Sequence, residues 1–169
     1  MTETHKVFLS FYNEDIEYKE KFEKLFSNCI VSKSIQEGEI PDGICTDETM
    51  RRIRDSLADS TVTVVLIGNN TYKRKYVDWE IYSSLRNTEY SSRSGLLGIL
   101  LPTRSDFNTN HYCASTIPPR LQDNVVTKYA HLYNWTYDHN QIVNMIDYAF
   151  SLRKTGKVDL SRERFGKNH

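Results

Sequence analysis

The chain has 169 residues, of which 38% are apolar and 26% charged, with 22 basic and 22 acidic side chains. This composition is typical of one folded domain and excludes disordered, collagen-like and membrane-spanning chains. A chain of this length buries about 70% of the surface that it exposes when unfolded, so it can hold a core without disulfides or metal. A net charge of zero gives no sign of a nucleic-acid or membrane partner.

The first third of the chain alternates strand and helix twice. Residues 6–11 and 29–35 are predicted strands, the former as a nearly continuous apolar run. Apolar side chains at i, i+4, i+7 and i+8 predict a helix over 18–26, and a spacing of i, i+3 and i+7 predicts another over 50–57. Thr46, which two carboxylates follow, is expected to cap this second helix.

The middle of the chain contains the two most apolar segments. Residues 61–67 and 95–101 are almost entirely Val, Leu and Ile, as in strands that are buried on both faces of a parallel sheet. Residues 75–87 between them are a predicted helix. Residues 102–124 hold three of the four prolines and many polar residues. We expect them to form a long connection with room for a short helix.

The last predicted elements are a strand over 129–135 and a helix over 142–150. The alternation of strands and helices predicts the α/β class, as a flavodoxin-like three-layer sandwich with a central, mostly parallel five-stranded sheet. We expect residues 1–155 to form this single domain. Residues 156–169 are expected to be a basic, flexible C-terminal tail.

Several catalytic signatures do not occur in the sequence. It has no GxGxxG, GxxxxGK[ST], GxSxG or HExxH pattern, and its three cysteines lack the spacing of zinc ligands, so no metal is expected. A phosphorelay receiver would end its third strand in an aspartate, whereas residues 66–69 read LIGN. The N-terminus does not resemble a targeting peptide, so we expect a cytoplasmic protein.

Polar and aromatic side chains gather where the predicted strands end. The carboxyl ends of parallel strands meet at one edge of the sheet, and ligands of such folds bind there. A rim of aromatic faces and hydroxyls suits a nucleotide. The expected rim residues are Ser10, Phe11, Tyr12, Asn13 and Asp15 after the first strand, Asp42 after the second and Asn69 after the third. Strand alternation places Phe8 and Phe11 on opposite faces, so Phe11, nearer the strand end, is the better candidate for stacking.

Three stretches of the sequence resemble Toll/interleukin-1 receptor (TIR) domains, most closely in the style of the TIR-like domain of bacterial Thoeris anti-phage systems. They read KVFLSFYNEDIEYKEKFEKLF (6–26), EIPDG (39–43) and TVTVVLIGNNTYKRKYVDWEIYSSLRN (61–87). The resemblance covers residues 5–90, and the pattern of strands and helices extends it to 152. It implies a TIR-like version of the predicted fold.

The resemblance also implies an activity. Enzymatic members of the family cleave NAD+ between nicotinamide and ribose, and their key glutamate corresponds to Glu80. Tyr76 and Trp79 would then wall the site, although the family usually has tryptophan where this chain has Tyr76. NAD+ would be the substrate, and no cofactor would be bound permanently.

The resemblance further implies partners. The product would be a cyclic ADP-ribose isomer or a related ADP-ribose conjugate, which would reach a separate effector by diffusion. We also expect self-association and activation by a phage component. Two alternatives stay open, namely a non-catalytic TIR-like interaction module and a flavodoxin-like domain that binds some other nucleotide.

Overall fold

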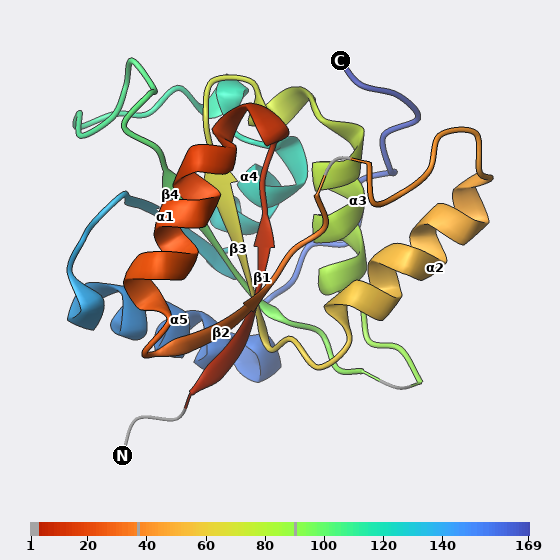
Figure 1. Cartoon of the computed structure of the whole chain (residues 1–169). Helices are drawn as coiled ribbons and strands as arrows, with labels where there is room; N and C mark the ends of the chain where they lie inside the picture. The colour runs from red at the N-terminus through yellow and green to blue at the C-terminus, as the bar shows by residue number, and fades with distance from the viewer. Residues whose placement is uncertain (1–3, 37, 90) are drawn as a thin grey trace.

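The described residues form five strands that lie parallel in one sheet, in the order β2-β1-β3-β4-β5 (Figure 1). This computed structural model describes residues 4–36, 38–89 and 91–169. The strands are β1 (His5–Ser10), β2 (Ile30–Lys33), β3 (Val62–Ile67), β4 (Gly95–Leu100) and β5 (Ala130–Asn134). Each of the five coincides with a predicted strand, so the α/β class and the parallel sheet are confirmed.

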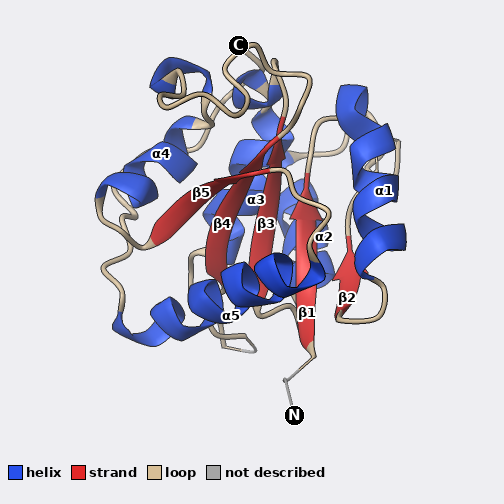
Figure 2. Ribbon diagram, turned by 90° about the vertical axis from the view of Figure 1, so that its left-hand side faces the viewer, coloured by secondary structure: helices blue, strands red, loops and turns tan. Residues whose placement is uncertain are grey.

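Helices cover both faces of the sheet, which makes three layers (Figure 2). The helices are α1 (Ile16–Phe26), α2 (Thr46–Leu57), α3 (Lys75–Ser84), α4 (Pro119–Val126) and α5 (His139–Thr155). Apolar residues of α1 and α5 share a core with one face of the sheet, and those of α2, α3 and α4 pack on the other face. Within the described ranges, none of these helices has the length and apolar character that crossing a membrane requires.

Strand β1 divides its side chains between the two faces as its alternation predicts. Val7 and Leu9 pack with α1 and α5, whereas Phe8 packs with Met50 and Ile53 of α2. Ser10 follows Phe8 by two residues and is therefore on the α2 and α3 face. This placement brings the Ser10 hydroxyl, rather than another apolar group, next to Glu80 of α3.

One local expectation is wrong, and the expectation of a short helix in a long connection is met. Thr46 is the first residue of α2 and not its cap; Cys45 holds the N-cap position and makes no side-chain cap bond. The expected connection over 102–124 contains the start of α4, because Pro119 suits the first turn of a helix and Leu121 adds an apolar anchor that is fully buried.

The C-terminal residues are folded against the domain, unlike the flexible tail that we expected. The Trp79 indole N–H donates to Phe165 O over 2.7 Å, and Lys75 N donates to the Asn168 side chain over 2.8 Å. Most of these contacts involve a backbone group, which is the same in every sequence. A solvated tail and a docked tail also have similar compositions, so the docking could not be predicted from the sequence. The division of the chain at residue 155 stays a prediction.

Gly95 lets α5 approach β4 closely. A Cβ built at this position would lie 2.3 Å from Ala149 O. We predict that Gly95→Ala lowers the free energy of unfolding by about 1–3 kcal/mol, because the α5 backbone must shift. Urea denaturation measures this change. Gly166→Ala is the control, since nothing lies within 4 Å of a Cβ there. Equal stability of the two variants would contradict the prediction.

Candidate functional site

A pocket of about 340 Å³ lies beside the carboxyl end of β1. Four segments form its wall: the chain after β1, the loop between β2 and α2, the start of α3, and the C-terminal segment with Asn168. The residues of the wall are Phe11, Tyr12, Asn13, Ile35, Gln36, Gly38, Ile40, Asp42, Arg74, Lys75, Tyr76, Val77, Glu80 and Asn168. The pocket thus occupies the edge of the sheet where the sequence predicts a ligand site.

Local sequence explains how the chain forms this wall. After Ser10 the chain leaves the sheet and turns in a 3-10 helix, Asn13–Asp15, which leaves Tyr12 half-buried at the rim. In the loop after β2, Gly38 and Gly43 have φ angles of 89° and 80°. Side chains disfavour this left-handed region, so glycine suits both turns. The loop bends between them and places buried Ile40 against the α2 and α3 side of the core.

Glu80 is the ionisable group at the buried end of the pocket. It is only 4% exposed, although its residue borders the pocket. Burial raises the pKa of its carboxyl from 4.5 to about 8, and the neighbouring Ser10 hydroxyl offsets part of that rise. Neither Ser10 Oγ nor Glu80 Oε2 forms a hydrogen bond within the described part of the chain. The carboxyl is therefore neutral in most molecules at pH 7 and ready to ionise beside a cation.

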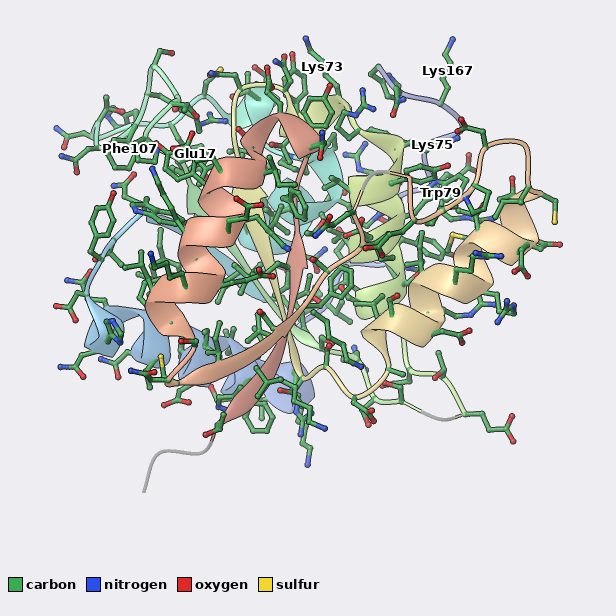
Figure 3. The ribbon with its side chains drawn as sticks, in the orientation of Figure 1. Glu17, Lys73, Lys75, Trp79, Phe107 and Lys167 are labelled. Carbon is green, nitrogen blue, oxygen red and sulfur yellow. The ribbon has the colours of Figure 1, made fainter. Side chains whose placement is uncertain are left out.

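Cations and aromatic rings form the outer part of the wall. The Arg74 guanidinium lies 4.3 Å from the centre of the Tyr12 ring. The Lys75 ammonium lies 5.2 Å from the Tyr76 ring and 4.9 Å from the Trp79 ring. Figure 3 shows Lys75 and Trp79 projecting from the same side of α3. Neither Arg74 nor Lys75 has a carboxylate partner among the described ion pairs, so this rim has positive charge available for a ligand.

Six of the expected site residues lie in the wall of the pocket. They are Phe11, Tyr12, Asn13, Asp42, Tyr76 and Glu80. Ser10 is fully buried beside Glu80, just behind the wall. The structure therefore brings residues from the ends of β1 and β2 together with α3, over separations of up to 70 positions in the sequence.

Three other expected residues lie outside the wall. Trp79 packs with Phe8 and Ile40 and supports the pocket from behind. Asn69 donates its side-chain N–H to Thr103 O over 3.0 Å, which ties the turn after β3 to the loop after β4. Asp15 is buried next to that same turn, 3.4 Å from Thr71 Oγ1.

The Asp15 carboxyl packs against Gly68. A Cβ at Gly68 would lie 2.3 Å from Asp15 Oδ2, so glycine leaves the space that this carboxyl fills. Burial and the nearby Glu14 carboxylate raise the pKa of Asp15 to about 6, while the bond to Thr71 lowers it. Asp15 is thus a second perturbed acid at the edge of the sheet, separate from the pocket.

Sequence reasoning missed several residues of the wall. Arg74 and Lys75 come directly before the glutamate motif, and two adjacent cations at the start of a predicted helix were a signal that we could have used. Asn168 comes from the segment that we expected to be flexible, and no pattern in the sequence indicates it. No group of three or more His, Cys, Asp or Glu side chains in the described ranges is arranged to hold a metal ion.

Comparison with known families places most of this pocket within one matched family segment. A family model described as the TIR-like domain of the Thoeris protein ThsB matches residues 8–106, which is more than half of the chain. The matched segment includes the second half of β1 and all of β2, β3 and α3, and therefore all of the pocket wall except Asn168. No curated protein matches the chain.

The raised pKa of Glu80 has a consequence for stability. Between pH 4.5 and about 8 the folded chain keeps a proton that the unfolded chain releases, so stability falls as the pH rises across this window. Glu80→Gln removes the ionisation. We predict that this variant is more stable than the parent by about 3 kcal/mol at pH 7 and that the difference vanishes near pH 4.5.

Thermal and urea unfolding at both pH values measure this difference. The control is Glu17→Gln, since Glu17 is exposed on α1, where it pairs with Lys21 (Figure 3). An exposed ion pair contributes at most about 1 kcal/mol, so this variant should track the parent. If the free energy of unfolding of Glu80→Gln exceeds that of the parent by no more at pH 7 than at pH 4.5, the pKa of Glu80 is not raised in the folded chain.

Proposed function

Since the chain belongs to the family of Thoeris ThsB TIR-like domains, we propose that it is an enzyme that cleaves NAD+ at the bond between nicotinamide and ribose. The proposal depends most on one observation. Glu80, at the position of the family's key glutamate, is a buried carboxyl with an unpartnered oxygen at the wall of the pocket.

The proposed reaction needs little beyond this carboxylate. The bond from the cationic nicotinamide nitrogen to the ribose carbon breaks, and its electron pair neutralises the ring. Nicotinamide therefore leaves as a neutral molecule without a general acid, in contrast to the leaving group of an ordinary glycoside. The ribose carbon, which becomes cationic, is then captured by water or by another hydroxyl or nitrogen nucleophile, which loses its proton.

Electrostatics gives Glu80 its proposed role. A carboxylate about 4 Å from the developing positive charge contributes on the order of 4 kcal/mol at an effective dielectric near 20. If this interaction exists only in the transition state, it accelerates the reaction by roughly a thousandfold. Burial makes the carboxylate unfavourable in the empty pocket, whereas a cationic nicotinamide ring favours the ionised form. The substrate thus helps to create the charge that acts on it.

The pocket also suits the shape of the substrate. Its volume of about 340 Å³ is at the small end of the usual range for ligand pockets, about 300–1,000 Å³. A nicotinamide riboside portion would occupy the cavity, and the rest of the dinucleotide would lie across the rim. Phe11 and Tyr12 offer aromatic faces for stacking, and Asp42 offers an acceptor for ribose hydroxyls.

The product is proposed to be a signal. In this proposal the enzyme releases a cyclic ADP-ribose isomer, or a related ADP-ribose conjugate, that activates a separate effector during anti-phage defence. Self-association and a phage-derived activator belong to the same proposal, because a defence enzyme that consumes NAD+ without control would harm its own cell. NAD+ is the substrate, and the proposed cycle uses no permanently bound cofactor.

Glu80→Gln tests the proposal most directly. We expect loss of about three orders of magnitude in NAD+ cleavage, because glutamine keeps the shape and lacks the charge. Cells that express the parent or the variant would be challenged with phage, and nicotinamide and ADP-ribose species would be measured by mass spectrometry. Glu17→Gln, at an exposed position of α1, should keep the full activity of the parent.

The product masses separate hydrolysis from cyclisation and conjugation. If parent and variant both leave NAD+ unchanged, in cells and as purified protein with phage lysate, the enzyme proposal fails. The non-catalytic interaction module then becomes the better reading, and binding partners should be sought.

The pH dependence of kcat/KM reports the ionisation of Glu80 in the free enzyme. We predict that kcat/KM rises about tenfold per pH unit and levels off near pH 8, where the buried carboxyl ionises. The inflection in kcat should lie at lower pH, because the cationic substrate lowers the pKa in the complex. Asp15→Asn should leave both inflections in place, since Asp15 lies outside the pocket. An inflection near pH 6 that this variant removes would assign the profile to Asp15.

A further inference from the structure

Residues 159–169, which we call the C-terminal strap, run along α4 and α3 to the pocket. The strap begins where Asp159 N donates to Asn124 Oδ1 over 2.8 Å on α4. It ends where His169 N donates to Lys73 O over 2.9 Å, just before α3. In Figure 1 this last segment, in dark blue, lies beside α3. The strap therefore connects the outer helices to the mouth of the pocket.

A buried ion pair anchors the middle of the strap. Arg120 of α4 is 1% exposed and donates to both carboxylate oxygens of Asp78 on α3. The same guanidinium donates to Arg162 O over 2.7 Å and to Glu163 O over 2.8 Å. Phe165 N donates to Asp78 Oδ2 over 2.8 Å. These contacts anchor the backbone of residues 162–165 to the buried ion pair, which does not reach residues 166–169 beyond them.

The tip of the strap occupies the N-terminus of α3. Asn168 Oδ1 accepts a hydrogen bond from Lys75 N, the first amide of the helix, over 2.8 Å. Asn168 also belongs to the wall of the pocket. An amide oxygen, with its partial negative charge, thus lies where the helix dipole and the free N–H groups favour an anion.

Other features of this position point to a ligand. The side chains of Arg74 and Lys75 flank the amide, line the pocket and contact aromatic rings, with no carboxylate partner in the described ranges. Five residues further along α3, buried Glu80 has an oxygen without a hydrogen-bond partner in the described part of the chain. Among the described residues, a helix N-terminus, two cations without a carboxylate partner and a buried acid with an unsatisfied oxygen therefore border one cavity.

We propose that the first amide of α3, with Arg74 and Lys75, is the diphosphate subsite of the pocket, and that Asn168 of the strap occupies this subsite until a diphosphate displaces it. The inference rests on the proposed function only in that the ligand is a nucleotide with a diphosphate. A neutral amide oxygen and an anionic phosphate oxygen compete for the same N–H, and the phosphate gains the charge-assisted bond. The strap is then an internal competitor that sets the threshold for nucleotide binding.

Substitutions at Asn168 should act in opposite directions. Asn168→Ala removes the competing oxygen, and we expect ADP to bind about two- to thirtyfold more tightly, as for the loss of a helix cap. Asn168→Asp puts a full negative charge on the amide, so ADP should bind more weakly than to the parent. Lys167→Ala is the matched control, because Lys167 is exposed and does not line the pocket (Figure 3).

Titration calorimetry with ADP, which lacks the scissile bond, measures these affinities in the full chain. Inorganic pyrophosphate should compete with ADP, because it carries the diphosphate without base or ribose. Hydrogen exchange, followed by mass spectrometry, adds a readout of the strap itself. ADP should speed the exchange of residues 166–169 in the parent and leave it unchanged in Asn168→Ala, where the tip is already released.

Each outcome decides the proposal. Unchanged or weaker ADP binding by Asn168→Ala overturns it, and weaker binding would make Asn168 a ligand contact. Absence of ADP binding in all variants overturns the subsite. Because ADP is not cleaved, these results are independent of turnover. If the chain binds ADP as predicted but does not cleave NAD+, the strap proposal stands and the enzyme proposal fails. If the Asn168 variants bind ADP as the parent does, while Glu80→Gln abolishes NAD+ cleavage, the enzyme proposal stands and the strap proposal fails.

Discussion

The Asp78–Arg120 ion pair fixes the helix on which the site depends. Seven of the ten residues of α3 are buried, so this helix has almost no solvated face. A buried ion pair stabilises a fold only when its remaining donors and acceptors are satisfied, because removing both charges from water costs several kcal/mol each. Here the carbonyls of Arg162 and Glu163 and the amide of Phe165 complete the set. The strap is thus part of the electrostatics of the core as well as of the surface.

Fixing Asp78 also fixes Glu80. The two residues are separated by about 200° around the helix, so when Asp78 turns toward α4 and the strap, Glu80 turns toward β1. There it lies beside Ser10, a neutral hydroxyl, and no described ion pair includes it. The fold therefore satisfies one carboxylate of α3 completely and leaves the other without compensation. Buried polar groups are normally paired, so an exception that borders a cavity is where function is expected.

The sequence predicted the layers well because the strongest signals came from burial. Strands β3 and β4 are buried at every position, and no exposed residue interrupts their apolar runs. The importance of Glu80 came from the family resemblance, since a helix that is buried almost all round has no amphipathic pattern to mark a special position. The docking of the strap was not predicted, because most of its contacts pair a side chain with a main-chain group, and main-chain groups leave no mark in the sequence. The Arg162–Asp123 ion pair does join two side chains, but its members lie 39 positions apart and follow no motif.

The distribution of charge in the pocket explains which ligand the two proposals share. Glu80 lies buried at the wall, whereas Arg74 and Lys75 belong to the outer part beside the helix N-terminus. A simple cation would gain from ionised Glu80 but meet the basic rim, and a simple diphosphate would gain from the rim but nothing from Glu80. A dinucleotide with a cationic ring and a diphosphate gains from both. Its ring ionises Glu80 while its phosphates displace Asn168, so in the proposed cycle binding and activation of the carboxylate are one event.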